Sequence, residues 1–225
     1  MVYITGSMHG DMECFHDGRF KHLKKGDTLI AVGNFGFLWD GGKKEQAALK
    51  WIGKRKYQVL FVEGWYENYN ELEQYEIVDF AGGKARKISD NLMQLMRGNV
   101  YHIEGKSIFT FGGGESPDRD DRIKAGTWYE HELPTAEELN FGLDNLEAEH
   151  NRVDYILTHE APWNVKRFLD LDEIDKNLHQ FYFDQLEEHI HYRHWFCSSL
   201  MQDKVIPPLY TCIYRRVVPL GEELK

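Results

Sequence analysis

Five short segments that contain glycine, histidine and other polar residues each follow an apolar run of the sequence. They lie at 6–11 (GSMHGD), 33–36 (GNFG), 64–68 (GWYEN), 158–162 (THEAP) and 197–201 (CSSLM). Because ligands of α/β proteins collect at the carboxyl ends of the central strands, at the edge of the sheet, we expect functional side chains in these segments. Histidine and carboxylate side chains at such an edge are the usual ligands of a divalent metal.

The order and spacing of these segments resemble the metal-binding blocks of the calcineurin-like metallophosphoesterase family. That family's pattern is Gly-Asp-x-His-Gly, Gly-Asp-x-x, Gly-Asn-His-Glu, a lone His after a strand, and Gly-His-x-His. The FGGG segment at 111–114 and the final stretch 210–220 also fit, so the resemblance extends over essentially the whole chain. It implies one α/β domain over 1–225, a four-layer αββα sandwich of two mixed β-sheets flanked by helices.

The resemblance also implies that most groups of the family's two-metal centre are replaced. His9 and His159 match expected histidines, but in the family they serve different metals. Asn34 stands where an Asp bridges both ions, and an amide cannot supply the negative charge that holds two cations about 3.5–4 Å apart. Other replaced positions are Ser7, Trp65, Tyr66, Ser199 and Met201. Without metals there is no water of low pKa to act as nucleophile.

We therefore predict a non-catalytic binding or regulatory protein with no resident cofactor. Its partner would be a nucleotide, another small phosphorylated ligand or a protein. The predicted ligand pocket consists of Ser7, His9, Asp11, Asn34, Trp65, Tyr66, Glu67, His159, Ser199 and Met201.

The alternative is an atypical metal-dependent phosphoesterase with a rebuilt site. His9 and His159 would hold Mn²⁺ or another divalent transition metal together with Asp11, Glu67 or Glu160. The simpler interpretation gives the histidines ordinary hydrogen-bond partners and lets the acids cap helix N-termini.

Other groups allow two interpretations each. Cys197 is either a nucleophile with His159 as base or a small buried residue. The segment 112–122 either covers the pocket with Arg119 and Arg122 or is a charged loop with internal ion pairs. Aromatic rings either form a wall on which a ligand stacks or fill the volume of the lost metals; these rings are Trp65, Tyr66 and Trp163. His189, His191 and His194 do not share one helical face, which favours a helix end that runs into a strand.

The elements that must position these groups alternate between strand and helix. Buried strands are expected at 2–5, 27–33, 57–64, 153–159 and 194–199, from their β-branched and aromatic residues. Helices are expected at 43–56, 136–150 and 172–189, the second with a capping box from Thr135 and Glu138. An antiparallel meander is predicted over 76–114, and closing strands over 209–220.

Composition limits the class of protein. The chain has 225 residues, of which 42% are hydrophobic, and three cysteines without metal-site spacing, so we expect one domain with reduced thiols. The net charge of −10 disfavours long nucleic acid, whose phosphate backbone requires clustered cations. We find no leader sequence and no apolar run long enough to span a membrane, and therefore predict a cytoplasmic protein with no membrane partner.

Overall fold

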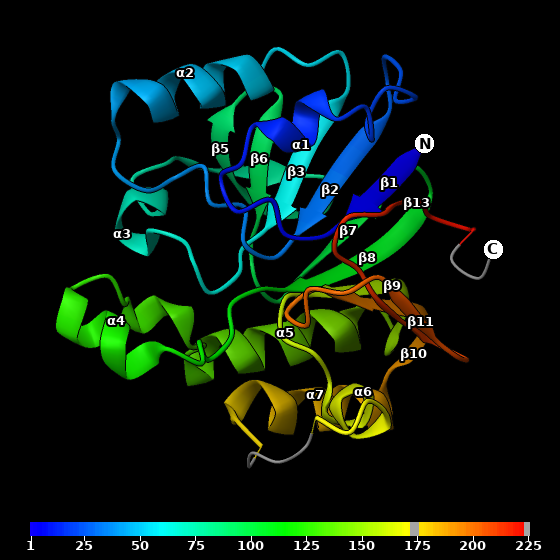
Figure 1. The fold of residues 1–225 in the computed structure, drawn as a ribbon. Helices are drawn as coiled ribbons and strands as arrows, with labels where there is room; N and C mark the ends of the chain where they lie inside the picture. Colours follow the sequence, from blue (N-terminus) through cyan, green and yellow to red (C-terminus); the bar gives the residue numbers. More distant parts are fainter. Residues whose placement is uncertain (172–175, 223–225) are drawn as a thin grey trace.

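The computed structural model describes residues 1–171 and 176–222 and has an α/β fold with two mixed β-sheets (Figure 1). The first sheet has seven strands in the order β13-β1-β2-β3-β6-β5-β4. Strands β1, β2, β3 and β6 run parallel, and β13 and β5 pair antiparallel with this central set. The bounds are β1 Val2–Thr5, β2 Thr28–Val32, β3 Gln58–Val62, β4 Ile77–Phe80, β5 Gly83–Ser89, β6 Leu92–Leu95 and β13 Val217–Pro219.

The second sheet has six strands in the order β11-β12-β10-β9-β8-β7. Its four central strands are parallel, whereas β7 and β11 are antiparallel edge strands. The bounds are β7 Asn99–Ile103, β8 Lys106–Phe111, β9 Arg152–Thr158, β10 His191–Cys197, β11 Lys204–Ile206 and β12 Tyr210–Cys212.

Helices cover the outer faces of both sheets, which pack against each other through their inner faces (Figure 1). In β2, Ile30 and Val32 face the second sheet, whereas Leu29 and Ala31 face α1 and α2. A strand buried on both faces has a continuous apolar sequence, which explains the run from Thr28 to Val32. The helices are α1 Glu13–His16, α2 Lys43–Ile52, α3 Tyr69–Leu72, α4 Arg119–Ala125, α5 Ala136–Ala148, α6 Trp163–Phe168 and α7 Leu178–His189, with a 3₁₀ turn at Glu130–Glu132.

Several local predictions are confirmed. The Thr135 hydroxyl accepts from the Glu138 amide, and the Glu138 carboxylate accepts from the Thr135 amide, so α5 begins with the expected capping box. Helix α7 begins one residue after Asn177, in a capping box with Gln180. The earlier part of the predicted helix, 172–175, lies outside the described residues.

Other predictions are wrong. The region 76–114 is not one meander, because β6 pairs parallel with β3 while β7 and β8 form a hairpin in the second sheet. The closing strands predicted over 209–220, in contrast, are confirmed as β12 and β13, which belong to different sheets. Helix α2 ends at Ile52 instead of continuing to residue 56, and α4 occupies part of the predicted charged loop.

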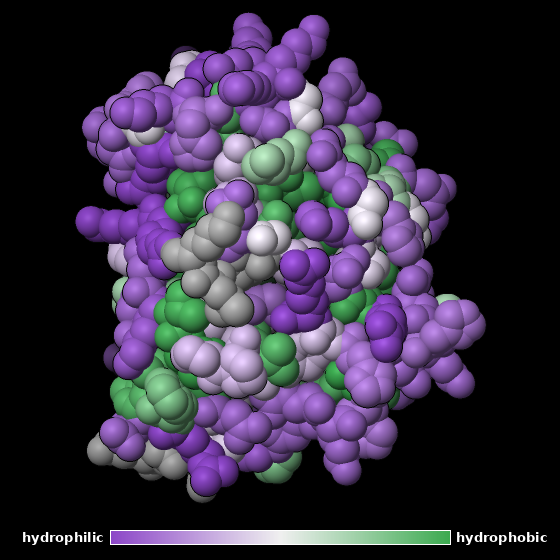
Figure 2. Space-filling view, turned by 90° about the vertical axis from the view of Figure 1, so that its right-hand side faces the viewer, coloured by the Kyte–Doolittle hydropathy of each residue, from purple (hydrophilic) through white to green (hydrophobic). Residues whose placement is uncertain are grey.

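Polar side chains dominate the surface seen in Figure 2, where apolar residues reach solvent only in small separate areas. Within the described part of the chain, every helix is too short or too polar to cross a bilayer.

Candidate functional site

Three of the five predicted segments converge on Gly33, just beyond the end of β2. A Cβ atom on Gly33 would lie 2.2 Å from both His159 Nδ1 and Ser198 Oγ, and 2.9 Å from Ser7 Oγ. The backbone N–H of His9 donates to the Asn34 carbonyl at 2.8 Å. Strand ends from both sheets are therefore packed so closely that only glycine fits between them.

The Asn34 side chain ties the second segment to the third. Its Oδ1 atom accepts from the backbone N–H of Tyr66 at 3.0 Å, and the residue is only 2% exposed. Gly64 permits this contact, since a Cβ there would lie 2.1 Å from the same Oδ1. The Asn34 amide thus holds the loop at 64–66 in place.

Glu67 makes a second tie between the same segments. Its carboxylate accepts from the backbone N–H of Phe35 at 2.5 Å and of Gly36 at 3.0 Å. Burial raises the pKa of Glu67 to about 8, against the opposing effect of these hydrogen bonds. The carboxylate is therefore committed to the loop at 35–36.

His159 lies at the centre of the strand ends and is fully buried. Its Nδ1 atom is hydrogen-bonded to Ser198 Oγ at 2.8 Å, and its ring meets the Trp65 ring edge to face at a centroid distance of 4.7 Å. Burial lowers the pKa of His159 to about 3, so the imidazole is neutral at ordinary pH. Among the described residues, none pairs with His159 Nε2, Ser7 Oγ or Trp65 Nε1, so a few polar atoms remain available at this point.

The remaining predicted pocket residues are more scattered. Ser199 Oγ accepts from the Ala161 N–H at 3.1 Å and joins the fifth segment to the fourth. Asp11 is exposed and accepts from the Glu13 N–H at the start of α1. His9 is exposed with its ring near Tyr214, and Met201 is 58% exposed in a left-handed turn.

The carboxylates that a rebuilt metal site would need are engaged elsewhere. Glu160 is 1% exposed, and its Oε1 atom pairs with Lys166 Nζ at 3.0 Å. Glu67 is bonded to backbone amides. Over 1–171 and 176–222, no group of three or more His, Cys, Asp or Glu side chains is arranged to hold a metal ion.

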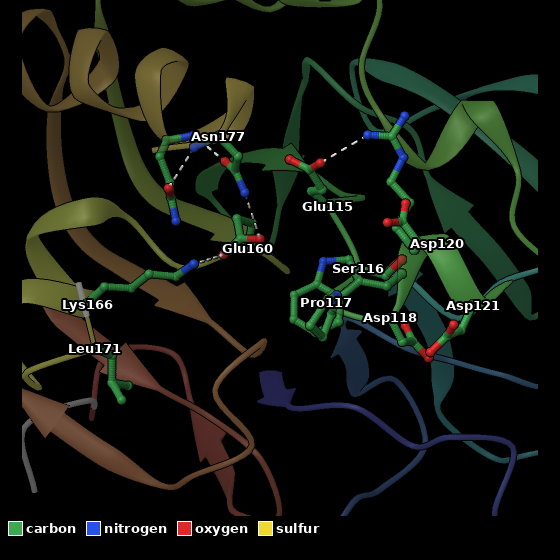
Figure 3. A pocket seen from close by; sticks show the side chains of 13 residues that line it. Glu115, Ser116, Pro117, Asp118, Asp120, Asp121, Glu160, Lys166, Leu171 and Asn177 are labelled. Atoms are coloured by element: carbon green, nitrogen blue, oxygen red, sulfur yellow. Dashed lines mark hydrogen bonds and ion pairs between the residues drawn. The ribbon is translucent and has the colours of Figure 1, made fainter. Parts of the chain in front are cut away.

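A cleft of about 450 Å³ lies beside the strand ends (Figure 3). Glu160, Lys166 and Asn177 form one wall, and Glu115 to Asp118 lie on the opposite side. Trp65 borders both the cleft and His159. Among the described residues of its lining are five carboxylates, Glu115, Asp118, Asp120, Asp121 and Glu160, and two cations, Arg119 and Lys166. The cleft therefore disfavours a phosphate group.

The two arginines of the segment 112–122 are held in internal ion pairs. Arg122 is buried and bonded to Glu132 at 2.6 Å, and its guanidinium lies 4.9 Å from the Tyr66 ring centroid. Arg119 pairs with Glu115 at 3.1 Å. The Tyr66 hydroxyl donates to Asp118 at 3.1 Å, so Tyr66 anchors the start of α4.

The structure favours the simpler interpretation of the other candidates. Cys197 is fully buried, its sulfur lies 3.9 Å from that of Cys212, and that contact raises the pKa of its thiol. His189 ends α7 and His191 begins β10, as expected from their spacing. Trp163 lies beside Lys176 and not against Trp65.

Sequence reasoning missed α4, although its signals were present. Two acids occupy its first turn, a lysine its last turn, and Gly126 follows in the left-handed conformation typical of a helix end.

Comparison with known proteins adds no assignment: no protein-family model and no curated protein matches this chain.

Proposed function

We propose that this chain is a non-catalytic binding or regulatory protein built on a calcineurin-like phosphoesterase scaffold. The observation that carries the proposal is the use of Asn34, where the family places a bridging Asp, as a hydrogen-bonding tie to Tyr66 N–H. Glu67 and Ser199 make similar ties between neighbouring segments. The strand-end side chains are thus bonded to the protein's own backbone.

The chemistry of hydrolysis argues in the same direction. A two-metal phosphoesterase needs a shared negative ligand between its ions to produce a bound hydroxide at neutral pH. Asn34 supplies no charge, and Trp65 occupies the space against the neutral ring of His159. The helix–sheet–sheet–helix layering agrees with the proposed scaffold, although fold alone does not assign function.

We further propose that the protein is cytoplasmic, as its three free, buried thiols suggest, and that its binding surface includes the acidic cleft. The excess of carboxylates in the cleft favours a basic segment of a protein partner there. A phosphorylated ligand would require a different part of the surface.

The test is elemental analysis of untagged protein, together with hydrolysis of a generic phosphodiester in the presence of Mn²⁺. We expect less than one tenth of a metal ion per chain and no turnover above a buffer control, in the wild type and in His9→Ala alike. Stoichiometric metal with turnover, both abolished by His9→Ala, would establish the rebuilt hydrolase instead. Because His9 is exposed, its replacement leaves the fold intact.

A further inference from the structure

A second cavity, of about 520 Å³, lies on the helix-covered face of the first sheet, at its other end. It is formed by residues 15–21, which include the end of α1 and the chain after it, and by residues 51–57, from the end of α2 to the residue before β3. The strand-end site follows the carboxyl ends of β2 and β3, whereas this cavity lies before the amino end of β3. It is therefore separate from the site and the cleft described above.

The charge of this cavity is opposite to that of the chain. Its cations are Lys21, Lys54, Arg55 and Lys56, with His16 beside them, and its described lining contains no carboxylate. The whole chain has 37 acidic residues against 27 lysines and arginines. Within 1–171 and 176–222, none of these four cations forms a salt bridge. Asp17 lies nearby in sequence but is paired with Arg19.

Aromatic rings form the remainder of the cavity. Phe20 and Tyr57 are buried at its floor, and Phe15 and Trp51 are partly exposed. The Arg55 guanidinium lies 3.3 Å from the Trp51 ring centroid and donates from Nε to the Trp51 carbonyl at 3.2 Å. The planar guanidinium is thus fixed on one face of the indole, and its other face can stack on a base.

The lysines have a second possible role, which is to oppose the dipole at the carboxyl end of α2. The helix end is already bonded, since the N–H groups of Gly53, Lys54 and Arg55 donate to carbonyls of its last turn. The cations around this aromatic cavity are more numerous than one ten-residue helix requires to offset the dipole at its carboxyl end.

We propose that this cavity is a nucleotide-binding site, in which Lys21, Lys54 and Lys56 contact the phosphates and the stacked Arg55–Trp51 pair contacts the base. Ammonium groups are suited to phosphate as mobile point charges, and guanidinium–aromatic pairs bind bases through their faces. The assignment deepens the proposed binding function and rests on it, but it places the phosphorylated ligand away from the acidic cleft.

The experiment is calorimetric titration of the full chain with ATP, tripolyphosphate and adenosine at low and moderate salt. We expect ATP to bind more tightly than either fragment, and its affinity to fall with salt, because screening weakens exposed charge pairs. Lys54→Gln/Lys56→Gln should weaken ATP binding by roughly tenfold or more, since two charge-assisted contacts are lost. The control, Lys43→Gln/Lys50→Gln, removes the same charge from exposed positions of α2 outside the cavity and should change affinity less than about twofold.

Arg55→Lys tests the base contact, because it keeps the charge and removes the planar surface. We expect ATP to bind this variant no better than tripolyphosphate does. The proposal is overturned if ATP fails to bind, if both lysine pairs lower affinity equally, or if tripolyphosphate matches ATP on the wild type. Phosphate release measured in the same samples separates the two proposals: hydrolysis would refute the non-catalytic function, whereas loss of binding would refute only this site.

Discussion

Arg97 is a buried cation with several hydrogen-bond partners, next to the chain at Gly113 that leads to the cleft loop. It follows β6, is 5% exposed, and donates from Nε to Glu63 Oε1 at 2.7 Å. Its other nitrogens donate to the carbonyls of His131 and Leu133 and to the Tyr69 hydroxyl. A Cβ on Gly113 would lie 2.4 Å from Arg97 Nη2, so this guanidinium also supports the chain leading to the cleft loop.

We predict that Arg97→Met is strongly destabilising. The change leaves Glu63, whose side chain is 2% exposed, with only the Gln94 amide as a side-chain partner, and deprives two carbonyls of a donor. Removing one partner of a buried ion pair costs about 3–5 kcal/mol. In a domain of this size each kcal/mol lowers the melting temperature by about 2–4 °C, so we expect a decrease of about 6–20 °C.

Urea unfolding followed by circular dichroism measures this change in the free energy of unfolding. The double variant Glu63→Gln/Arg97→Met should be more stable than Arg97→Met alone, because it removes the uncompensated buried charge. Arg152→Met replaces an exposed arginine of β9 and should stay within about 0.5 kcal/mol of the wild type. A loss below about 1 kcal/mol for Arg97→Met, as expected of an exposed pair, would refute the reasoning.

Three further predictions concern the strand ends. Gly33→Ala should cost about 1–3 kcal/mol more than Gly26→Ala, because overpacking has a cost of about this size. Both glycines have φ near +90°, but only Gly33 is crowded by side chains. Urea midpoints measure the difference, and equal losses would contradict the prediction. Burial lowers the pKa of His159 to about 3 from an ordinary value of 6.5, so the unfolded chain binds the extra proton and stability falls as pH falls below 6.5. His159→Phe removes this effect, so between pH 6.5 and 5 the free energy of unfolding should fall less steeply with pH, by up to about 1.4 kcal/mol per pH unit. The buried His179 should still contribute to the pH dependence. A pH dependence equal to that of the wild type would argue against a neutral buried imidazole. Trp65→Ala should expose His159 and raise its pKa toward 6.5 in an NMR titration, whereas Trp39→Ala, at a ring far more exposed, should leave it unchanged.

Local signals in the sequence predicted most elements. The apolar run of β2 and the capping box of α5 are set by residues next to one another, so they can be recognised without the rest of the chain. Strand pairing depends on distant partners instead. The run at Leu92–Leu95 looks the same whether it pairs only with β5 or also with β3, which is why the split of the predicted meander could not be foreseen.

In the candidate site, too, local sequence signals predicted some features, whereas others depend on distant parts of the chain. The sequence located the strand ends, because functional side chains of α/β proteins collect after the carboxyl ends of central strands. It did not predict that Gly33, after β2 of the first sheet, would meet His159, after β9 of the second. It could not reveal that the Asn34 amide would accept from Tyr66 N–H, since that bond depends on the path of a loop. Met201 resembled a pocket residue by position only, and its left-handed turn instead presents the side chain to solvent.

The hydrogen bond made by Asn34 bears on how readily a metal site could be introduced at the strand ends. An Asn34→Asp change would keep the acceptor for Tyr66 N–H but bury a new negative charge at a position that is only 2% exposed. A metal would offset that charge, yet Trp65 lies against His159 and would have to give way first. If the proposed scaffold is right, each single change toward the family's ligand set is unfavourable alone, so several positions would have to change together to build a metal site.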